Sequence, residues 1–418
     1  MVKGEIITIG NELISGRRID LNSCYAAGRL TAIGIQVLRI TSVGDNYEMV
    51  SDAIKKAISR SNFVIVTGGL GSTQDDITNK IVAKALNRPL ILNKTAFDHI
   101  QEKIKEIGLN MNPSLEKMAW MPEGAKILDL EGSTCGYSIK HKEVSLYFLP
   151  GVPEQMRYLL DKFVIPDILQ KSKNLPFISR KILKLYGVNE AVIAESLKDI
   201  KYSHNISIGF YPEFPEHHIV ITAKGGKKED IKEELNNIKA EIEKKLSSYI
   251  FATEDISMEY VIGQLLRKHR LTLSIAESCT GGLIGHRITN IPGSSQYFMG
   301  GVVVYSNEAK TKLLGVDPNT LKNFGAVSAE TAKEMAEGVK NSIPSDIGIA
   351  VTGIAGPNGG TKEKPVGTVF IGLCSKKGTF IQRYRFFGNR MQIKLNTSTM
   401  ALDWIRRYIN GDTFLPGI

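Results

Sequence analysis

The sequence predicts an α/β protein with three parts: two three-layer α/β domains and a smaller α+β unit between them. Short apolar, β-branched runs alternate with segments of helical period through residues 1–100, and the alternation returns between residues 258 and 408. This alternation is typical of a parallel or mixed sheet that helices cover on both faces. A chain of 418 residues is also too long for one ordinary core. We therefore expect domains over residues 1–170, 171–252 and 253–418.

The first domain shows the order β-α-β-α-β-α, which favours a parallel sheet. Its strands are expected at residues 5–9, 35–40 and 63–67, and its helices near 22–33, 47–59 and 76–86. The segment Gly68-Gly69-Leu70-Gly71 directly follows the third of these strands. Open α/β sheets bind ligands at the carboxyl ends of their strands, so this segment marks a candidate site. Near residues 135–138 and 144–148 the pattern changes to that of a short hairpin.

The middle unit follows a basic and polar linker at Lys171–Pro176. Its expected elements are a strand at 181–186, a helix at 190–198, strands at 207–210 and 218–223, and a charged helix at 228–247.

The last domain begins with a helix at 258–268 and suits three layers around a mixed sheet. Its expected strands are at 271–275, 301–305, 347–352, 368–374 and 380–386, and its further helices are at 281–289, 329–339 and 390–408.

Composition favours a cytoplasmic protein. The N-terminus runs directly into a strand, without a basic segment followed by an apolar one, and no apolar run reaches the roughly 18 residues that a membrane span needs. Four cysteines without a C-x-x-C motif indicate neither a zinc site nor a disulfide framework. The net charge of +10 is spread along the chain and not clustered, so it does not favour nucleic-acid binding.

The segment A-E-S-C-T-G-G at Ala276–Gly282 carries the most chemical information, because it lies between an apolar strand and a predicted helix. A helix start offers unpaired N–H groups and a partial positive charge, and glycines let a ligand approach closely. We expect Thr280, Gly281 and Gly282 to contact a phosphate or an oxyanion. In isolation, a helix cap made by Ser278 or Thr280 would explain the same pattern.

A series of further motifs follows this segment, and together they resemble one family. They read G-S-S at 293–295, Y-S-N-E-A-K at 305–310, G-A-V-S at 325–328, T-G-I-A-G-P at 352–357 and K-P-V-G-T at 364–368. The series is similar to the C-terminal amidohydrolase domain of the CinA family. This resemblance implies deamidation of nicotinamide mononucleotide to nicotinate mononucleotide with release of ammonia.

The N-terminal third resembles another part of the same family. Its motifs are I-G-N-E-L-I-S-G at 9–16, T-G-G-L-G-S-T-Q-D-D at 67–76 and L-P-G-V-P-E-Q-M at 149–156. They are similar to the family's molybdopterin-binding-like domain, for which the resemblance implies cleavage of ADP-ribose. The middle unit is similar to the KH-like module of full-length relatives. Its turn Gly187-Val188-Asn189-Glu190 lacks the second glycine with which nucleic-acid-binding KH modules clamp phosphates.

Hydrolysis of a carboxamide requires an activated nucleophile and a base. None of the matched motifs contains a histidine, so a lysine with a lowered pKa is the alternative base. Lys310 is the candidate, with Tyr305 as a proton relay and Ser295 as the nucleophile, in agreement with the family motifs. This pairing requires the chain at 293–298 to fold back beside the next strand. Ser278 is the rival nucleophile, because a strand-turn-helix junction exposes a serine.

Three further residues are candidates for substrate binding in this domain. Thr352 and Gly353 follow a predicted strand, and Arg390 begins the last helix. We expect Thr352 to hydrogen-bond the substrate and Arg390 to bind its phosphate through charge-assisted bonds. A helix cap and a solvated surface charge are the alternatives for Thr352 and Arg390. Cys279 is interpreted as a structural thiol, and no cofactor is expected for this domain.

Cleavage of a pyrophosphate requires neutralisation of charge at phosphorus, usually by a divalent metal such as Mg, Mn or Co. Glu12, Asp75 and Asp76 are the candidate ligands, although the two aspartates also suit ordinary helix capping. The predicted phosphate-binding residues of this domain are Gly68, Gly69, Gly71 and Thr73. Ser72 stands where the family usually has proline, which makes the turn less rigid.

The sequence therefore favours a bifunctional enzyme of pyridine-nucleotide recycling that forms a homodimer, as the family does, and acts on nicotinamide mononucleotide and ADP-ribose. Two other hypotheses remain open. In one, the N-terminal domain binds a nucleotide or pterin without turnover. In the other, suggested by the family's link to competence, the protein associates with DNA.

Overall fold

The computed structural model describes residues 2–129, 136–172, 176–225 and 228–416. The chain forms two compact units, one of Met1–Ser179 with Lys224–Lys228 and one of Arg180–Ala223 with Glu229–Ile418. Each unit is described by itself below.

The first unit is built on a six-stranded sheet in the order β2-β1-β3-β8-β7-β6. β1, β2, β3 and β8 pair in parallel, whereas β7 is antiparallel to β8 and β6 is antiparallel to β7. A separate two-stranded sheet joins β4 to β5. The strands are β1 (Lys3–Ile9), β2 (Gln36–Val43), β3 (Phe63–Thr67), β4 (Leu90–Leu92), β5 (Trp120–Pro122), β6 (Lys126–Ile127), β7 (Tyr137–His141) and β8 (Val144–Leu149).

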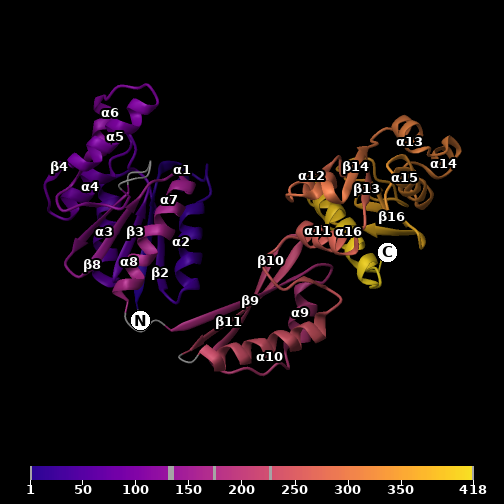
Figure 1. Cartoon of the computed structure of the whole chain (residues 1–418), viewed down its shortest axis with the longest axis horizontal. Coiled ribbons are helices and arrows are strands. Elements are labelled where there is room, and N and C mark those ends of the chain that lie inside the picture. The colour runs from indigo at the N-terminus through magenta and orange to yellow at the C-terminus, as the bar shows by residue number, and fades with distance from the viewer. Residues whose placement is uncertain (1, 130–135, 173–175, 226–227, 417–418) are drawn as a thin grey trace. The chain divides into compact units, whose positions relative to one another are not determined.

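Helices cover both faces of this sheet, and each face has its own apolar core (Figure 1). The side chains of Ile7, Val64 and Phe148 pack with α3, α4 and α5, while Ile6 and Ile65 pack with α2, α7 and α8. Successive side chains along each strand point to opposite faces of the sheet, so one sheet contributes to two cores. The helices are α1 (Asn11–Ile14), α2 (Leu21–Ala32), α3 (Tyr47–Arg60), α4 (Thr78–Ala85), α5 (Lys94–Glu106), α6 (Pro113–Glu116), α7 (Pro153–Leu159) and α8 (Ile165–Lys171), with single 3-10 and π turns at Lys117–Ala119 and Leu160–Val164.

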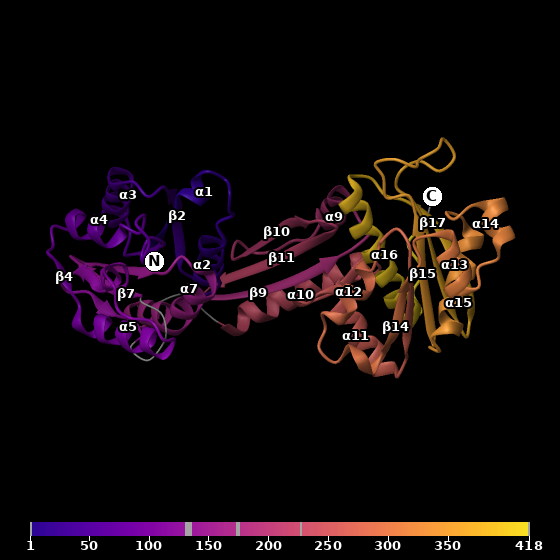
Figure 2. The ribbon, with the colours of Figure 1, turned by 90° about the horizontal axis from the view of Figure 1, so that it is seen from above.

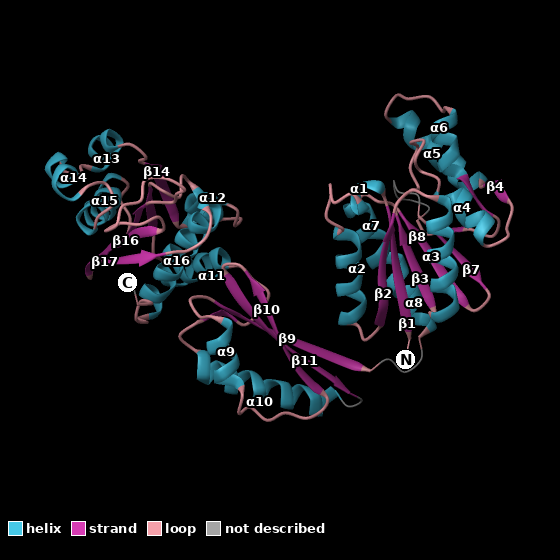
Figure 3. Ribbon diagram, turned by 180° about the vertical axis from the view of Figure 1, so that it is seen from behind, coloured by secondary structure: helices cyan, strands magenta, loops and turns pink. Residues whose placement is uncertain are grey.

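The middle region forms a four-stranded sheet in the order β10-β11-β9-β12, with two helices packed against it (Figure 3). The buried side chains of the longer helix recur at helical spacing, at Ile231, Leu235, Ile238 and Ile242, which gives it one apolar face. The elements are β9 (Phe177–Leu185), α9 (Glu190–Leu197), β10 (Ile206–Glu213), β11 (Glu216–Gly225), α10 (Lys228–Leu246) and β12 (Ile250–Ala252).

The C-terminal part of the second unit has three layers around a mixed sheet in the order β14-β13-β15-β16-β17 (Figure 2). β13 pairs in parallel with β14 and β15, and the remaining pairs are antiparallel. The strands are β13 (Leu273–Glu277), β14 (Phe298–Val303), β15 (Ile347–Gly353), β16 (Thr368–Ser375) and β17 (Gly378–Arg385). The helices are α11 (Met258–His269), α12 (Leu283–Thr289), α13 (Asn307–Leu314), α14 (Pro318–Phe324), α15 (Ala329–Ser342) and α16 (Arg390–Asn410), with a 3-10 turn at Ser294–Gln296.

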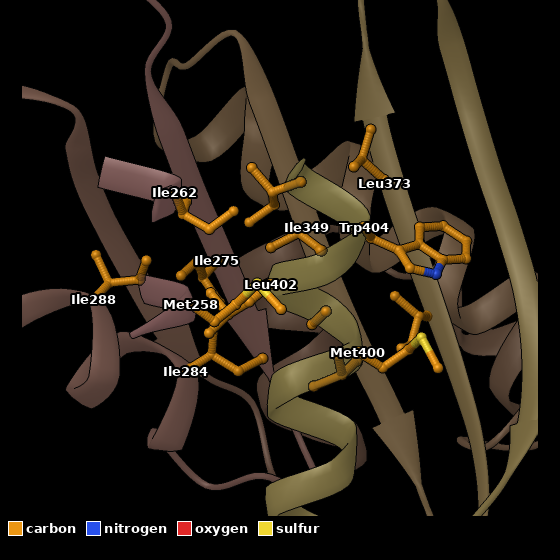
Figure 4. Close-up of a cluster of buried hydrophobic side chains, with 14 of the residues drawn as sticks. Met258, Ile262, Ile275, Ile284, Ile288, Ile349, Leu373, Met400, Leu402 and Trp404 are labelled. Atoms are coloured by element: carbon orange, nitrogen blue, oxygen red, sulfur yellow. The ribbon is translucent and has the colours of Figure 1, made fainter. Parts of the chain in front are cut away.

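The larger core of this region lies between the sheet and helices α11, α12 and α16 (Figure 4). Trp404 and Leu402 of α16 meet Ile275 and Ile349 of the sheet, and all four are fully buried. Tyr186 belongs to the same core and donates from its hydroxyl to the Asn396 carbonyl at 3.1 Å. The middle and C-terminal regions of this unit therefore share apolar packing.

Buried ion pairs also stabilise the contact between the middle and C-terminal regions of this unit. The carboxylate of Asp403 binds Arg406 and Arg407, and all three side chains are buried. Arg407 also donates to the carbonyl oxygens of Ser248 and Thr413. One helix thus links the middle region to the C-terminal tail through charge-assisted hydrogen bonds.

The predicted α/β fold class is confirmed, and the expected strands of the first 100 residues and of the C-terminal region all occur within a few residues of their predicted positions. The sequence did not indicate the helices α1, α5, α6, α7, α8, α13 and α14 or the short strands β4, β5, β6 and β12. Part of the predicted linker and Cys135 lie outside the described residues, and the other three cysteines are free thiols. Among the described residues, no helix is long and apolar enough to cross a membrane.

Candidate functional site

A cavity of about 220 Å³ lies at the carboxyl ends of β13 and β15 in the second unit. Parallel strands bring their following loops to one edge of a sheet, which explains why segments far apart in sequence meet here. The cavity is lined by Ser278, Cys279, Tyr305, Lys310, Ala326, Val327, Thr352, Gly353, Ala355 and Arg390.

Lys310 is the most unusual of these residues, because its side chain is only 1% exposed. It lies on α13, which begins where the Ser306 hydroxyl accepts a hydrogen bond from the Ala309 amide at 3.1 Å. The amine Nζ lies 3.1 Å from Ser278 Oγ, 2.8 Å from the Val304 carbonyl oxygen and 3.4 Å from the Tyr305 carbonyl oxygen. Among the described residues, the hydrogen-bond partners of this amine are one hydroxyl and two carbonyl oxygens, and all three are neutral.

Burial lowers the pKa of Lys310 below its usual 10.5, because a charged amine loses hydration that neutral partners do not replace. The neutral amine has two hydrogens and one lone pair. The two carbonyl oxygens can only accept hydrogen bonds, so they take the hydrogens. The lone pair then faces the Ser278 hydroxyl, which is the arrangement needed to remove its proton.

Ser278 directly follows β13, and a buried carboxylate fixes the turn on which it lies. Glu277 is 3% exposed, and its two oxygens accept hydrogen bonds from the backbone amides of Gly282, Ile284 and Gly285 at 3.0, 3.1 and 2.8 Å. The side chain thus caps α12 from inside the protein. Because the cap and Ser278 are adjacent in sequence, the cap holds the serine close to Lys310.

The prediction that Gly281 and Gly282 offer free amides to a phosphate is not supported by this geometry. The Gly282 amide is bound to Glu277, and the Gly281 amide donates to the Ser278 carbonyl at 3.2 Å. These glycines serve the tight turn instead, with φ angles of 63° and 93°. Thr280 is fully buried, and its hydroxyl has no hydrogen-bond partner among the described residues.

The predicted substrate-binding residues Thr352, Gly353 and Arg390 do line the cavity. The Thr352 hydroxyl donates to the Ala326 carbonyl at 2.6 Å, which leaves its oxygen able to accept. Arg390 donates to the Gly356 carbonyl at 2.7 Å and to the Tyr305 hydroxyl at 3.0 Å. Tyr305 is 62% exposed, so it stands at the mouth of the cavity.

The predicted pair of Ser295 and Lys310 is not formed. Ser295 is exposed in the 3-10 turn before β14, whereas Lys310 follows the other end of that strand. Six residues of extended strand span roughly 20 Å. The chain does not fold back beside the strand as the pairing required, and Ser278 is the serine that Lys310 contacts.

Cys279 is buried beside this pair. Burial raises the pKa of its thiol to about 12, so the thiol keeps its proton near neutral pH. This geometry agrees with its interpretation as a structural thiol.

The first unit has its own cavity, of about 660 Å³, at the carboxyl ends of β1, β3 and β8. Gly68 and Gly69 lie in its wall with φ angles of 106° and 68°. A Cβ atom on Gly68 would lie 2.1 Å from the Ile9 carbonyl oxygen, so only glycine fits there. The predicted residues Gly68, Gly69, Gly71 and Thr73 all line this cavity.

Four carboxylates line the same cavity: Glu12, Asp45, Asp75 and Asp76. Burial and the charges of the other three raise the pKa of Asp45, which shows that their negative charges act on one another. Asp76 accepts hydrogen bonds from the amide and hydroxyl of Thr73 at 2.9 and 2.6 Å, so it also caps the turn.

These oxygens suit a hard divalent cation chemically. Across the described residues, however, no three His, Cys, Asp or Glu side chains converge closely enough to hold one by themselves. Mg²⁺ is commonly held by one or two carboxylates together with substrate phosphates and water. The residues therefore fit a metal that arrives with a phosphorylated ligand.

Comparisons with known proteins match most of the chain to three family models. Residues 5–170 match a family described as a probable molybdopterin binding domain, residues 180–252 the damage-inducible protein CinA KH domain, and residues 255–409 the CinA C-terminal domain. A CinA-like protein of Geotalea uraniireducens is 41% identical over 403 residues, which cover 96% of each chain. The chain belongs to the CinA family.

A second full-length relative agrees with this assignment. A putative competence-damage inducible protein of a Thermoanaerobacter species is 38% identical over 413 residues, covering 98% of this chain and 99% of its own. The crystal structure of a competence/damage inducible protein from Agrobacterium tumefaciens is 41% identical, covers 37% of this chain and 93% of its own, and has a TM-score of 0.36.

The turn that follows β9 in the CinA KH domain is exposed at Gly187, Asn189 and Glu190. A Cβ atom on Gly187 would lie 2.1 Å from Leu415 Cδ1 of the C-terminal tail, so a side chain at this position would meet that residue. The missing second glycine, and not burial of the turn, is what speaks against phosphate clamping here.

We expect Glu277→Ala to destabilise the C-terminal domain, because it leaves three amide groups without their acceptor. Each buried unpaired group costs about 1–3 kcal/mol, so the free energy of unfolding should fall by about 3 kcal/mol or more. Urea unfolding followed by Trp404 fluorescence in a Trp120→Phe background measures this domain alone. The exposed Glu330 provides the control, since Glu330→Ala should cost less than about 1 kcal/mol. Equal effects of the two substitutions would contradict the capping role.

Proposed function

We propose that the C-terminal domain hydrolyses the carboxamide of nicotinamide mononucleotide, giving nicotinate mononucleotide and ammonia, with Ser278 as the nucleophile and Lys310 as the base. The observation that carries this proposal is the buried contact of 3.1 Å between Lys310 Nζ and Ser278 Oγ inside the cavity. A serine activated by a neutral lysine is a known solution for acyl transfer.

In the first half of the reaction, Ser278 Oγ attacks the carboxamide carbon while Lys310 Nζ takes the hydroxyl proton. The C–O bond forms and the carbonyl π electrons move to oxygen, which becomes an oxyanion. When the oxyanion collapses, the C–N bond breaks and Lys310 returns the proton to the leaving nitrogen, so ammonia departs. The product of this half is an ester between Ser278 and the pyridine carboxyl group.

In the second half, water replaces ammonia in the cavity. Lys310 takes one proton from the water as its oxygen attacks the ester carbon. Collapse of this second intermediate breaks the C–O bond to Ser278, and the proton returns to Ser278 Oγ. The product is released as the carboxylic acid, which loses its proton to water and becomes the carboxylate. Both halves use the same base, which explains why a single buried amine suffices and why we propose no cofactor for this domain.

The polar rim of the cavity supports a phosphorylated substrate. Arg390 directs a guanidinium toward the mouth, where it pairs with the Tyr305 hydroxyl. Since that hydroxyl accepts from Arg390, its own hydrogen remains available to a ligand. We propose that Arg390 and the Tyr305 hydroxyl bind the substrate phosphate at the mouth, and that Thr352 accepts a hydrogen bond from the substrate.

We propose for the N-terminal domain the hydrolysis of ADP-ribose to AMP and ribose 5-phosphate. The observation that favours this activity is that one cavity is lined both by the glycine turn, Gly68–Gly71, and by four carboxylates. A divalent metal, Mg, Mn or Co, would supply charge neutralisation at phosphorus. Glu12 and Asp75 are the carboxylates best suited to hold it, because Asp76 is already bound to Thr73. The backbone of Gly68, Gly69 and Gly71 would cradle the phosphates.

The other predictions on partners remain predictions. Formation of a homodimer is one of them. Binding of a nucleotide or pterin without turnover stays the alternative for the N-terminal domain. The turn at 187–190 lacks the second glycine of nucleic-acid-binding KH modules, so it gives no support to association with nucleic acid.

Ammonia release from nicotinamide mononucleotide in the presence of EDTA tests the first proposal. Ser278→Ala and Lys310→Met should each lower the rate by roughly 10³-fold or more, because nucleophile and base act as one unit. Ser295→Ala, the matched serine control, should leave the rate within about twofold. A large loss with Ser295→Ala alone, or no ammonia from the unchanged protein, would overturn the assignment.

The pH dependence of this rate follows from the direction of the Lys310 pKa shift. Only the free amine can act as a base, and its fraction grows as pH rises toward a pKa that burial holds below 10.5. The rate should therefore rise with pH through the neutral and mildly alkaline range and level off before pH 10.5. A rate that falls over this range would exclude a lysine base. Lys310→Arg should be inactive at every pH, since its guanidinium stays charged.

AMP release from ADP-ribose tests the second proposal. We expect activity with a divalent metal, none with EDTA, and at least about tenfold loss for Glu12→Gln or Asp75→Asn. Ammonia release by the same variants should not change, because the two sites lie in different units. Binding of ADP-ribose without any AMP release would favour the binding alternative.

A further inference from the structure

A second cavity, of about 470 Å³, adjoins the glycine turn of the N-terminal domain. Gly69, Leu70, Gly71 and Asp76 line both this cavity and the larger one with the carboxylates. The two spaces are therefore neighbours across one short turn. Each has a volume in the range of about 300–1,000 Å³ that is usual for small-molecule sites.

The far wall of the second cavity carries an exposed tryptophan. Trp120 is 37% exposed, although indole is among the largest apolar groups in proteins. Together with Leu90 and Pro113 it forms an apolar wall. An exposed aromatic wall inside a cavity is typical of sites that bind a flat ring.

The indole is held firmly in this position. Its Nε1 donates to Glu116 Oε1 at 3.2 Å, and its strand β5 pairs with β4 at Leu92. The Trp120 carbonyl accepts from the Asn79 side chain at 3.0 Å, and Asn79 accepts in turn from the buried Tyr137 hydroxyl at 2.8 Å. The ring is thus positioned by the core of the domain before any ligand arrives.

Positive charge lies between the aromatic wall and the turn. Lys117 lines the second cavity, and its amine donates to the Thr73 carbonyl at the edge of the larger cavity. Lys80 lines the second cavity as well. A ligand with its ring on Trp120 and its phosphates on the glycine turn would pass directly by Lys117.

We propose that this cavity binds the flat heteroaromatic ring of a phosphorylated ligand, stacked on Trp120, while the phosphates lie on the glycine turn. The inference rests on the proposed function in one respect, because it places phosphates at the same turn. The inference goes beyond the proposed function because it assigns binding of the ring to Trp120, Leu90 and Pro113, which lie outside the cavity with the carboxylates. A nucleobase and a pterin share this ring chemistry, and the experiment below separates them.

Fluorescence offers a direct test, since the chain has two tryptophans. Trp404 is fully buried in the other unit, with its ring stacked on Phe414 at 4.2 Å, so ligands should not alter its emission. With EDTA present to prevent turnover, ADP should quench Trp120 in a saturable way, and ribose 5-phosphate should not. The same titration is made with a phosphorylated pterin. The ligand that quenches Trp120 at the lower concentration shows whether the cavity prefers a nucleobase or a pterin.

Calorimetry of variants gives a second readout. Trp120→Ala should weaken ADP binding by roughly 5- to 150-fold, the range for loss of one stacked base. Trp120→Phe keeps a stacking face and should bind more tightly than Trp120→Ala. Pyrophosphate, which has no ring, should bind all three proteins alike, and this checks that the glycine turn is intact.

The outcomes are separable from those of the hydrolysis assay. Quenching by ADP without cleavage of ADP-ribose would sustain the ring site and contradict the proposed activity. Cleavage of ADP-ribose with no quenching, or equal ADP affinity for Trp120→Ala and the unchanged protein, would overturn the ring site alone. Absence of binding by every ring ligand would overturn it as well.

Discussion

The hydrogen bonds of the buried Glu277 carboxylate determine how the C-terminal site is built. Three backbone amides of α12 converge on this one side chain. Without it, a buried helix start would carry unpaired donors, which proteins rarely tolerate. Because Glu277 ends β13 and Ser278 follows it, the same contact fixes both the helix and the serine. The position of Ser278, the proposed nucleophile, is therefore a consequence of capping as well as of strand direction.

The buried amine of Lys310 depends on this turn in return. A lysine that is 1% exposed needs polar neighbours, and it finds two carbonyl oxygens from the chain that leaves β14 and one hydroxyl from the turn after β13. None of these groups is charged, so burial favours the neutral amine. A carboxylate at the same place would have raised the pKa of Lys310 and favoured the charged amine, which cannot act as the proposed base. The absence of an acidic partner from the amine's three contacts is thus part of its chemistry.

The sequence was sufficient for the fold class and for the segments that form both sites, because strand-helix alternation and glycine turns are local patterns. It was not sufficient for the pairing of side chains. Ser295 and Ser278 both precede Lys310 in matched motifs, and choosing between them required the direction of β14, which carries Lys310 away from Ser295. Helix α13 was missed because its eight residues have few apolar positions. The sequence also did not indicate the capping role of Glu277, because that role depends on the three amides that its side chain meets in the fold.

Both units have a cavity at the carboxyl ends of parallel strands, but the backbone amides near the two cavities are used differently. In the N-terminal domain, glycines at the carboxyl end of β3 leave an open turn in a large cavity, which suits the charged oxygens of a phosphate. In the C-terminal domain, an internal carboxylate already occupies the amides at the start of α12. A second anion there would be repelled by the charge of Glu277. This repulsion favours an anionic group at the mouth, near Arg390, and a neutral group in the interior, as the proposed nicotinamide mononucleotide substrate would place them.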